Sequence, residues 1–110
     1  MTQQTDFMPA AAGEITPERI IRRFADLGVQ LTGVADDSRK VRRGDLFMAY
    51  PGDLNDGRRF IADAIARGAA SVFWEARGDF VWNADWRVAN LSGTGLRALC
   101  GPLAHAVFGQ

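Results

Sequence analysis

The sequence is poor in the residues and patterns on which several protein classes depend. Its 110 residues include one cysteine and one histidine, too few for an intramolecular disulfide or a cysteine-rich metal site. Thirteen Lys and Arg residues balance thirteen Asp and Glu residues, which leaves no net positive charge for generic binding to nucleic acid or anionic membranes. No apolar run approaches the roughly 18 residues of a membrane span, and the first residues show no targeting signal. We therefore expect a cytoplasmic protein that binds no metal, no nucleic acid and no membrane.

What the sequence does contain is typical of one globular domain. Hydrophobic residues make up 47% of the chain and charged residues 24%, which excludes intrinsic disorder. The length is enough for one core. Residues 1–14 are polar or small and show no periodicity, so we predict a flexible leader there and a single domain over residues 15–110.

Hydrophobic periodicity and turn residues predict alternating strands and helices. Helices are expected from Pro17 to Gly28, after Asp56 as far as Gly68, and over residues 91–108; strands are expected at residues 29–35, 46–50, 69–75 and 86–89. Strand, helix and strand within about thirty residues form the pattern of a parallel β-α-β unit. The expected fold class is α/β, with a small, mostly parallel sheet of about four strands and flanking helices.

Two features near the C-terminal end test this assignment. Pro102 lies inside the last helical pattern and should kink or split it, because proline lacks a backbone donor and crowds the preceding turn. Gly93-Thr94-Gly95 is glycine-rich, but neither the spacing nor the lysine of a phosphate-binding loop follows it. We therefore do not expect this chain to bind ATP.

Two polar segments follow predicted strands and are the candidate binding loops. The first loop, residues 36–40, reads Asp-Asp-Ser-Arg-Lys, and the second loop, residues 53–57, reads Asp-Leu-Asn-Asp-Gly. Ligands of open parallel sheets usually bind at the carboxyl ends of the strands, where both loops are expected. Ordinary solvated turns explain the same residue types, so spacing alone leaves both interpretations open.

Residues 33–75 carry a longer pattern. They contain D-S-R-x-V-x-x-G-D-L-F-x-A, then P-G, then D-G-x-x-F-I-x-x-A-I-x-x-G-A. In this order the motifs closely resemble the amino-terminal domain of the Mur ligase family, which adds amino acids to the cytoplasmic peptidoglycan precursor. Residues 88–110 are similar to the end of that domain in the MurE type.

The resemblance implies a substrate-binding role for both loops. In MurE-type enzymes this domain holds the uridine diphosphate end of UDP-N-acetylmuramoyl-L-alanyl-D-glutamate. Carried over by position, the contacts fall at Asp36 and Ser38 and at Asp53, Leu54 and Asn55. Asp36 is expected to contact a diphosphate through its backbone, because its carboxylate would repel the phosphates. Arg39 either contacts the ligand or supports the first loop.

The resemblance also implies what the chain needs from elsewhere. The full enzymes use ATP and Mg²⁺ to add a diamino acid, meso-diaminopimelate or L-lysine, with central and carboxy-terminal domains that this sequence does not contain. The chain alone is therefore expected to hold no catalytic residue, cofactor or metal and to be inactive as a ligase. Two alternatives stay open: the equivalent domain of a MurF-type ligase that adds D-alanyl-D-alanine, and a standalone non-catalytic binding or interaction module.

Overall fold

A computed structural model describes residues 6–8 and 15–109 of the chain. In chain order its helices and strands are β1 (Asp6–Met8), α1 (Pro17–Asp26), β2 (Val34–Ala35), the 3-10 turn η1 (Ser38–Lys40), β3 (Leu46–Ala49), the 3-10 turn η2 (Gly57–Phe60), α2 (Ile61–Ala66), β4 (Ser71–Glu75), β5 (Ala89–Gly93) and α3 (Leu96–Phe108).

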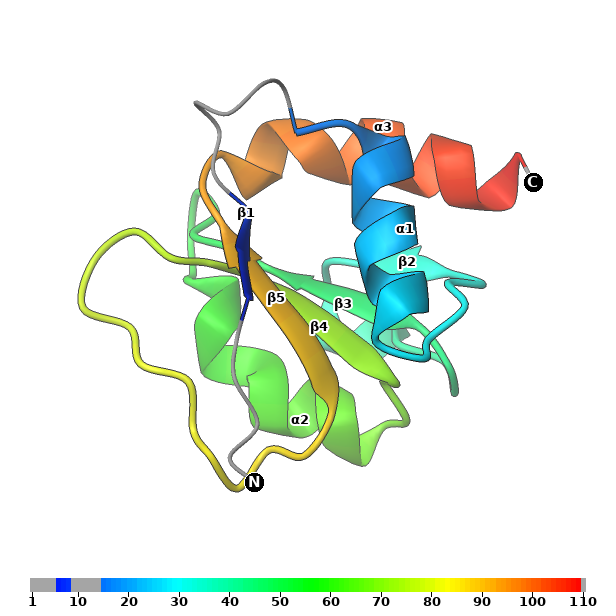
Figure 1. Cartoon of the computed structure of the whole chain (residues 1–110). Coiled ribbons are helices and arrows are strands. Elements are labelled where there is room, and N and C mark those ends of the chain that lie inside the picture. Colours follow the sequence, from blue (N-terminus) through cyan, green and yellow to red (C-terminus); the bar gives the residue numbers. More distant parts are fainter. Residues whose placement is uncertain (1–5, 9–14, 110) are drawn as a thin grey trace.

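The five strands form one parallel sheet in the order β1-β5-β4-β3-β2. Figure 1 shows α1 and α3 over one face of this sheet and α2 under the other. The long connection between β4 and β5, residues 76–88, packs aromatic side chains on the α2 side. The predicted α/β class is therefore confirmed, with five strands where the sequence indicated about four.

Burial on both faces explains the apolar central strands. Leu46 and Met48 of β3 pack in the layer that contains α1 and α3, whereas Phe47, between them, packs in the layer that contains α2. A parallel sheet covered by helices on both faces needs apolar residues at every strand position, not at alternate ones. Each large side chain buried in this way contributes about 1.5–3 kcal/mol to stability.

The predicted β-α-β unit is formed by β3, α2 and β4. Asp56 caps the short η2 turn, and α2 follows directly. Gly68 comes after α2 with a φ of 109°, and a Cβ there would lie 2.9 Å from the Cα of Arg43, so this position requires glycine. Because β2 and β3 run in parallel, the two candidate loops leave the same edge of the sheet.

The predicted leader is wrong at Asp6–Met8. These residues form β1, which pairs with β5 in parallel register from Asp6 opposite Leu91 to Met8 opposite Gly93. Three residues are too few to show periodicity, and the pairing with β5 decides their conformation. The rest of the predicted leader, residues 1–5 and 9–14, lies outside the described residues.

The boundaries near the C-terminal end also differ from the prediction. The strand expected at residues 86–89 is Ala89–Gly93, and the helix expected from residue 91 begins at Leu96. Leu91 continues the leucine spacing of α3, but it reaches the same core from the sheet. Because β5 and α3 contribute leucines to the same core, hydrophobic spacing alone predicted a helix over residues that form the strand.

Two further expectations need correction. The strand predicted at residues 29–35 is limited to Val34–Ala35, although Leu31 is buried in the core. Pro102 does not split the last helix, which runs unbroken from Leu96 to Phe108. Pro102 and Ala98, whose carbonyl loses its partner to the proline, are both exposed, so water can satisfy that carbonyl.

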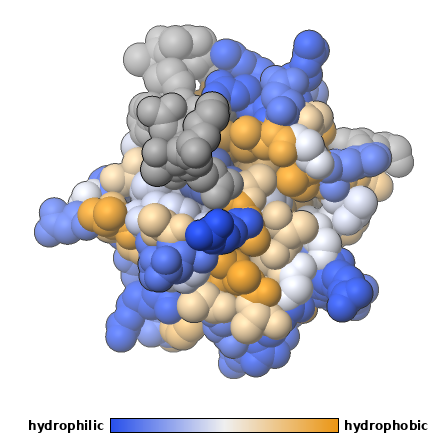
Figure 2. All heavy atoms as spheres, turned by 60° about the horizontal axis from the view of Figure 1, so that its bottom comes forward, coloured by the Kyte–Doolittle hydropathy of each residue, from blue (hydrophilic) through white to orange (hydrophobic). Residues whose placement is uncertain are grey.

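The surface is mixed in character. On the face turned forward in Figure 2, apolar side chains gather toward the middle and hydrophilic ones project around the edge. Within residues 6–8 and 15–109, no helix combines the length and apolar character needed to cross a membrane.

Candidate functional site

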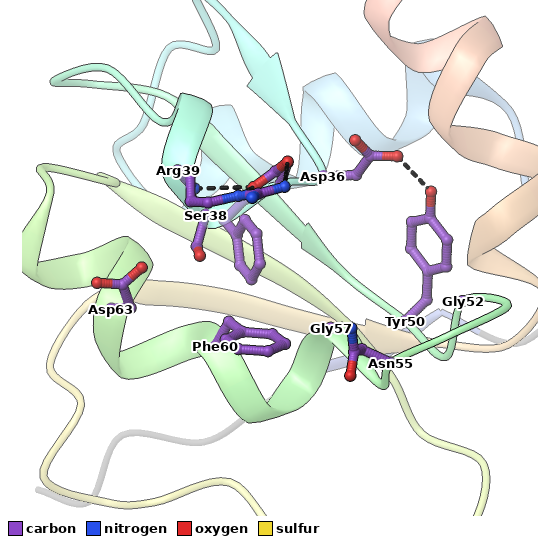
Figure 3. A pocket seen from close by; sticks show the side chains of 11 residues that line it. Asp36, Ser38, Arg39, Tyr50, Gly52, Asn55, Gly57, Phe60 and Asp63 are labelled. Atoms are coloured by element: carbon purple, nitrogen blue, oxygen red, sulfur yellow. Dashed lines mark hydrogen bonds and ion pairs between the residues drawn. The ribbon is translucent and has the colours of Figure 1, made fainter.

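A pocket of about 480 Å³ opens between the two candidate loops (Figure 3). It receives residues from the first loop, from the end of β3, from the second loop and from the η2–α2 segment. The lining residues are Asp36, Asp37, Ser38, Arg39, Phe47, Tyr50, Gly52, Asn55, Gly57, Phe60 and Asp63. The tertiary structure thus brings together two loops that the sequence singled out separately.

The first loop is held by contacts among its own residues. The Asp37 side chain caps η1 by accepting a hydrogen bond from the Arg39 backbone N–H at 2.9 Å. The Arg39 guanidinium donates to both carboxylate oxygens of Asp37, at 3.0 and 2.8 Å. These hydrogen bonds lower the pKa of Asp37 to about 2. Arg39 is thus bonded within the first loop, and its two predicted roles, ligand contact and loop support, stay predictions.

The Asp36 side chain points toward Tyr50, which follows β3. Its carboxylate accepts a hydrogen bond from the Tyr50 hydroxyl at 2.5 Å, as Figure 3 shows. Burial is the main cause that raises the pKa of Tyr50, and this hydrogen bond is the second. Burial is also the main reason that the pKa of Cys100 in α3 rises to about 11, and the Asp36 charge adds to it. The Asp36 carboxylate is thus engaged with Tyr50, and a backbone contact between Asp36 and a ligand stays a prediction.

Ser38 and Asp63 line the inner part of the pocket. Ser38 is 6% exposed, and its hydroxyl lowers the pKa of the Asp63 carboxyl by hydrogen bonding. The rings of Phe47 and Phe60 complete this part, Phe47 fully buried in the sheet and Phe60 partly exposed at the end of η2. A hydroxyl group, a carboxylate and two aromatic rings therefore line this part of the pocket.

The second loop enters the pocket through Asn55. The loop closes on itself where the Gly52 N–H donates to the Asn55 carbonyl at 2.8 Å. Gly57 then passes close to β3: its N–H donates to the Tyr50 carbonyl at 2.9 Å, and a Cβ would lie 3.0 Å from that oxygen. Only glycine permits this approach without a shift of the backbone.

Arg58 anchors the end of the second loop to the segment after β4. Its side chain is 9% exposed and pairs with Asp56 at 2.7 Å. The guanidinium also donates to the backbone carbonyls of Glu75 and Arg77 and stacks 5.3 Å from the centre of the Phe80 ring. One buried side chain thus joins residues that lie up to 24 positions apart in the sequence, Asp56 and Phe80.

The structure does not bring every predicted contact residue into the pocket. Asp36, Ser38, Arg39 and Asn55 line it, whereas Asp53 and Leu54 do not. Leu54 is 94% exposed at the tip of the second loop. The Asp53 carboxylate is paired with the Arg97 guanidinium, which lowers the pKa of Asp53.

Sequence reasoning missed several lining residues, above all Tyr50, Phe60 and Asp63. Phe60 lies at the end of the 3-10 turn η2 and lines the pocket. The spacing of three between Phe60 and Asp63 was the available signal, since it places both on one side of a helix.

The Gly93–Gly95 segment does not suit a phosphate. The backbone N–H groups of Gly95 and Leu96, at the start of α3, donate to the two carboxylate oxygens of Glu75, at 3.2 and 3.1 Å. Glu75 is itself buried, so an anion at this helix terminus would meet a fixed carboxylate. Within the described part of the chain, no group of three or more His, Cys, Asp or Glu residues is placed to hold a metal ion. The start of α3 is therefore occupied by a protein carboxylate and does not offer its N–H groups to a phosphate.

Comparison with known proteins identifies the family. A family model described as "Mur ligase family, catalytic domain" matches residues 30–106, more than half of the chain. The chain belongs to this family.

Three of the similar proteins carry the same enzyme name. The chain is 47% identical over 74 residues to the UDP-N-acetylmuramoyl-L-alanyl-D-glutamate–2,6-diaminopimelate ligase of Neisseria meningitidis serogroup A. These 74 residues make up 67% of the chain and 15% of that protein. The chain is 42% identical over 83 residues to the ligase of the same name from Chromobacterium violaceum, covering 76% of the chain and 17% of that protein. For the Pseudomonas putida enzyme of this name, identity is 64% over 42 residues, 38% of the chain and 8% of that protein. The chain thus spans less than a fifth of the length of these relatives.

Proposed function

We propose that the chain is the substrate-anchoring N-terminal domain of a ligase that adds a diamino acid to UDP-N-acetylmuramoyl-L-alanyl-D-glutamate in the cytoplasm. The observation that carries this proposal is the pocket in which Ser38 of the first loop and Asn55 of the second loop meet. The names of the relatives support meso-diaminopimelate as the amino acid rather than L-lysine. The same names do not favour the two alternatives, a domain of a ligase that adds D-alanyl-D-alanine and a standalone non-catalytic module.

The charge of the pocket suits the uridine end of such a substrate. Asp36, Asp37 and Asp63 place three carboxylates in the lining, and the Arg39 guanidinium is already paired with Asp37. A neutral heterocycle or ribose, with aromatic surface from Phe60 beside it, avoids the repulsion that phosphates would meet inside. The proposed arrangement therefore holds uridine in the pocket and leaves the diphosphate at its mouth.

In this proposal ATP and Mg²⁺ belong to parts of the relatives' length that these 110 residues do not span. Glu75 occupies the helix terminus that follows Gly93-Thr94-Gly95, so this segment does not offer its backbone N–H groups to a triphosphate. We expect the 110-residue chain to release no phosphate from ATP above a control without enzyme, with or without amino acids. Turnover above that control would contradict the assignment of a purely anchoring role.

Titration of ¹⁵N-labelled chain with UDP tests the anchoring role directly. We expect weak, saturable shifts at the amides of Ser38 and Asn55, because one wall of the complete site offers few contacts against the cost of ordering the ligand. Titration with ADP is the control, since a pocket that selects uridine should respond less to a purine. Unperturbed amides at Ser38 and Asn55 under excess UDP would refute the proposal.

A further inference from the structure

The tip of the second loop is fastened to α3 by a paired hydrogen bond. Both Arg97 guanidinium nitrogens of the fork donate to the Asp53 carboxylate, Nη1 to Oδ1 at 2.8 Å and Nη2 to Oδ2 at 2.9 Å. The two residues are 44 positions apart in the sequence, and Arg97 lies in the first turn of a helix on the opposite side of the sheet from α2. The pair therefore connects a surface loop beside the pocket to the α1–α3 layer.

The rest of the loop shows what this connection controls. Its distal end is anchored separately, because Asp56 is held by buried Arg58. Between these two fixed points lie Leu54, which is almost fully exposed, and Asn55, which lines the pocket. Asn55 thus lies on a short span held at Asp53 on one side and at Asp56 on the other, and its carbonyl also accepts a hydrogen bond from the Gly52 N–H.

We propose that Arg97 is a positioning residue for substrate binding, acting through Asp53 to set the placement of Asn55 at the pocket. This inference rests on the proposed function. A carboxylate that already accepts two hydrogen bonds from one guanidinium is poorly placed to contact a diphosphate as well. Asp53 accordingly belongs to the support of the loop, and the loop meets the ligand through Asn55. Lysine is a poor substitute, because a single ammonium cannot form the planar two-point contact.

The test uses NMR to compare UDP binding by the 110-residue chain and five variants, one of which is a control. Exposed ion pairs contribute little free energy, so we expect Arg97→Ala to weaken UDP binding only about two- to fivefold. Asp53→Asn should weaken it to a similar extent, and Arg97→Lys should cause most of the same loss. The reversed pair, Asp53→Arg with Arg97→Asp, should regain part of the affinity lost in Arg97→Ala. Arg87→Ala is the matched control, since it removes an exposed arginine that lines none of the pockets.

A second measurement separates failure of this inference from failure of the proposed function. Relaxation of the Asp53, Leu54 and Asn55 amides in the ligand-free chain should show greater motion in Arg97→Ala than in the wild-type chain, with an unchanged melting temperature. If Arg97→Ala binds UDP as tightly as the wild-type chain does, or if its loop relaxation is unchanged, the positioning role of Arg97 is refuted. In either case, UDP binding by the wild-type chain still upholds the proposed function. Absence of UDP binding by the wild type refutes the proposed function and, with it, a role for Arg97 in binding.

Discussion

The two loops that flank the pocket differ in how they are stabilised. In the first loop, Asp37 is bonded to the backbone and side chain of Arg39 two positions away, and Asp36 accepts a hydrogen bond from the more distant Tyr50. The second loop is held by distant residues, Asp53 by Arg97 in α3 and Asp56 by an arginine that reaches the segment after β4. The Asp37–Arg39 contacts need only the local sequence, whereas the anchors of the second loop depend on the assembled fold.

This difference has consequences for mutation. Changes in the first loop should act locally, on the titration of its own carboxylates and on the groups that face the ligand. Loss of the buried Arg58 anchor of the second loop should also affect global stability, because Arg58 joins separate elements. The four predictions that follow test this contrast, in decreasing order of expected effect.

The largest effect is expected from Arg58→Met. This substitution removes a buried cation that pairs with Asp56 and donates to two backbone carbonyls, and it leaves these acceptors without their partner. We expect a loss of about 2–3 kcal/mol in the free energy of unfolding, because hydrogen bonds to charged groups are the stronger ones. Urea unfolding followed by tryptophan fluorescence measures it. Arg59→Met, at the exposed neighbouring position, is the control and should change stability by less than about 0.5 kcal/mol. Equal effects of the two substitutions would show that Arg58 is no special anchor.

Ser38→Ala tests the first loop as a ligand contact. Loss of one neutral hydrogen bond costs about 0.5–1.5 kcal/mol, so UDP binding should weaken about two- to tenfold. In a full-length enzyme the same change should raise KM and leave kcat nearly unchanged, since the uridine end is remote from the reacting carboxyl. A clear loss of melting temperature with unchanged UDP affinity would instead assign Ser38 to the structure of the loop.

Arg39→Ala tests how local the first loop is. Removal of the guanidinium should raise the pKa of Asp37 from about 2 toward its ordinary value, whereas Lys40→Ala should change it much less, since the Lys40 charge is the weakest influence. Because the native pKa is lowered, the contribution of Asp37 to stability is present above the unfolded pKa of about 3.9 and is lost as the pH falls toward 2. NMR titration of the carboxyl carbons gives both values. An Asp37 pKa unchanged by Arg39→Ala would show that other contacts hold the loop.

The smallest effect concerns Cys100, which lies behind Asp36. With a pKa of about 11, its thiol should react with iodoacetamide far more slowly at pH 8 than a free cysteine does. Asp36→Asn should lower this pKa and speed alkylation modestly, because burial is the main cause and remains in place. Alkylation kinetics by mass spectrometry test this, with the unfolded chain in urea as the reference. Wild-type alkylation at the rate of the unfolded chain would contradict the assigned environment.

Much of the fold was readable from local patterns, and the failures share one cause. The helix after Pro17 and the β3–α2–β4 unit were predicted because their apolar spacing, capping residues and glycines agree with one another. The positions of β1, β5 and the start of α3 were wrong because their conformation depends on pairing across the sheet. Leu91 illustrates this, since its spacing fits a helix and its place beside Phe73 makes it a strand residue.

For the site, the sequence by itself determined the chemistry of the first loop. Asp37, Ser38 and Arg39 are close in sequence, so capping and ion pairing follow from local geometry in any fold that contains them. Only the tertiary structure decided that Asn55 faces the same pocket, that Asp53 pairs with Arg97, and that Glu75 occupies the start of α3. These arrangements bring together residues that are far apart in the sequence. Ser38 and Asn55 are 17 positions apart, and Asp53 and Arg97 are 44, so no local pattern encodes them. Their geometry is set by strand order and by the packing of helices on both faces of the sheet.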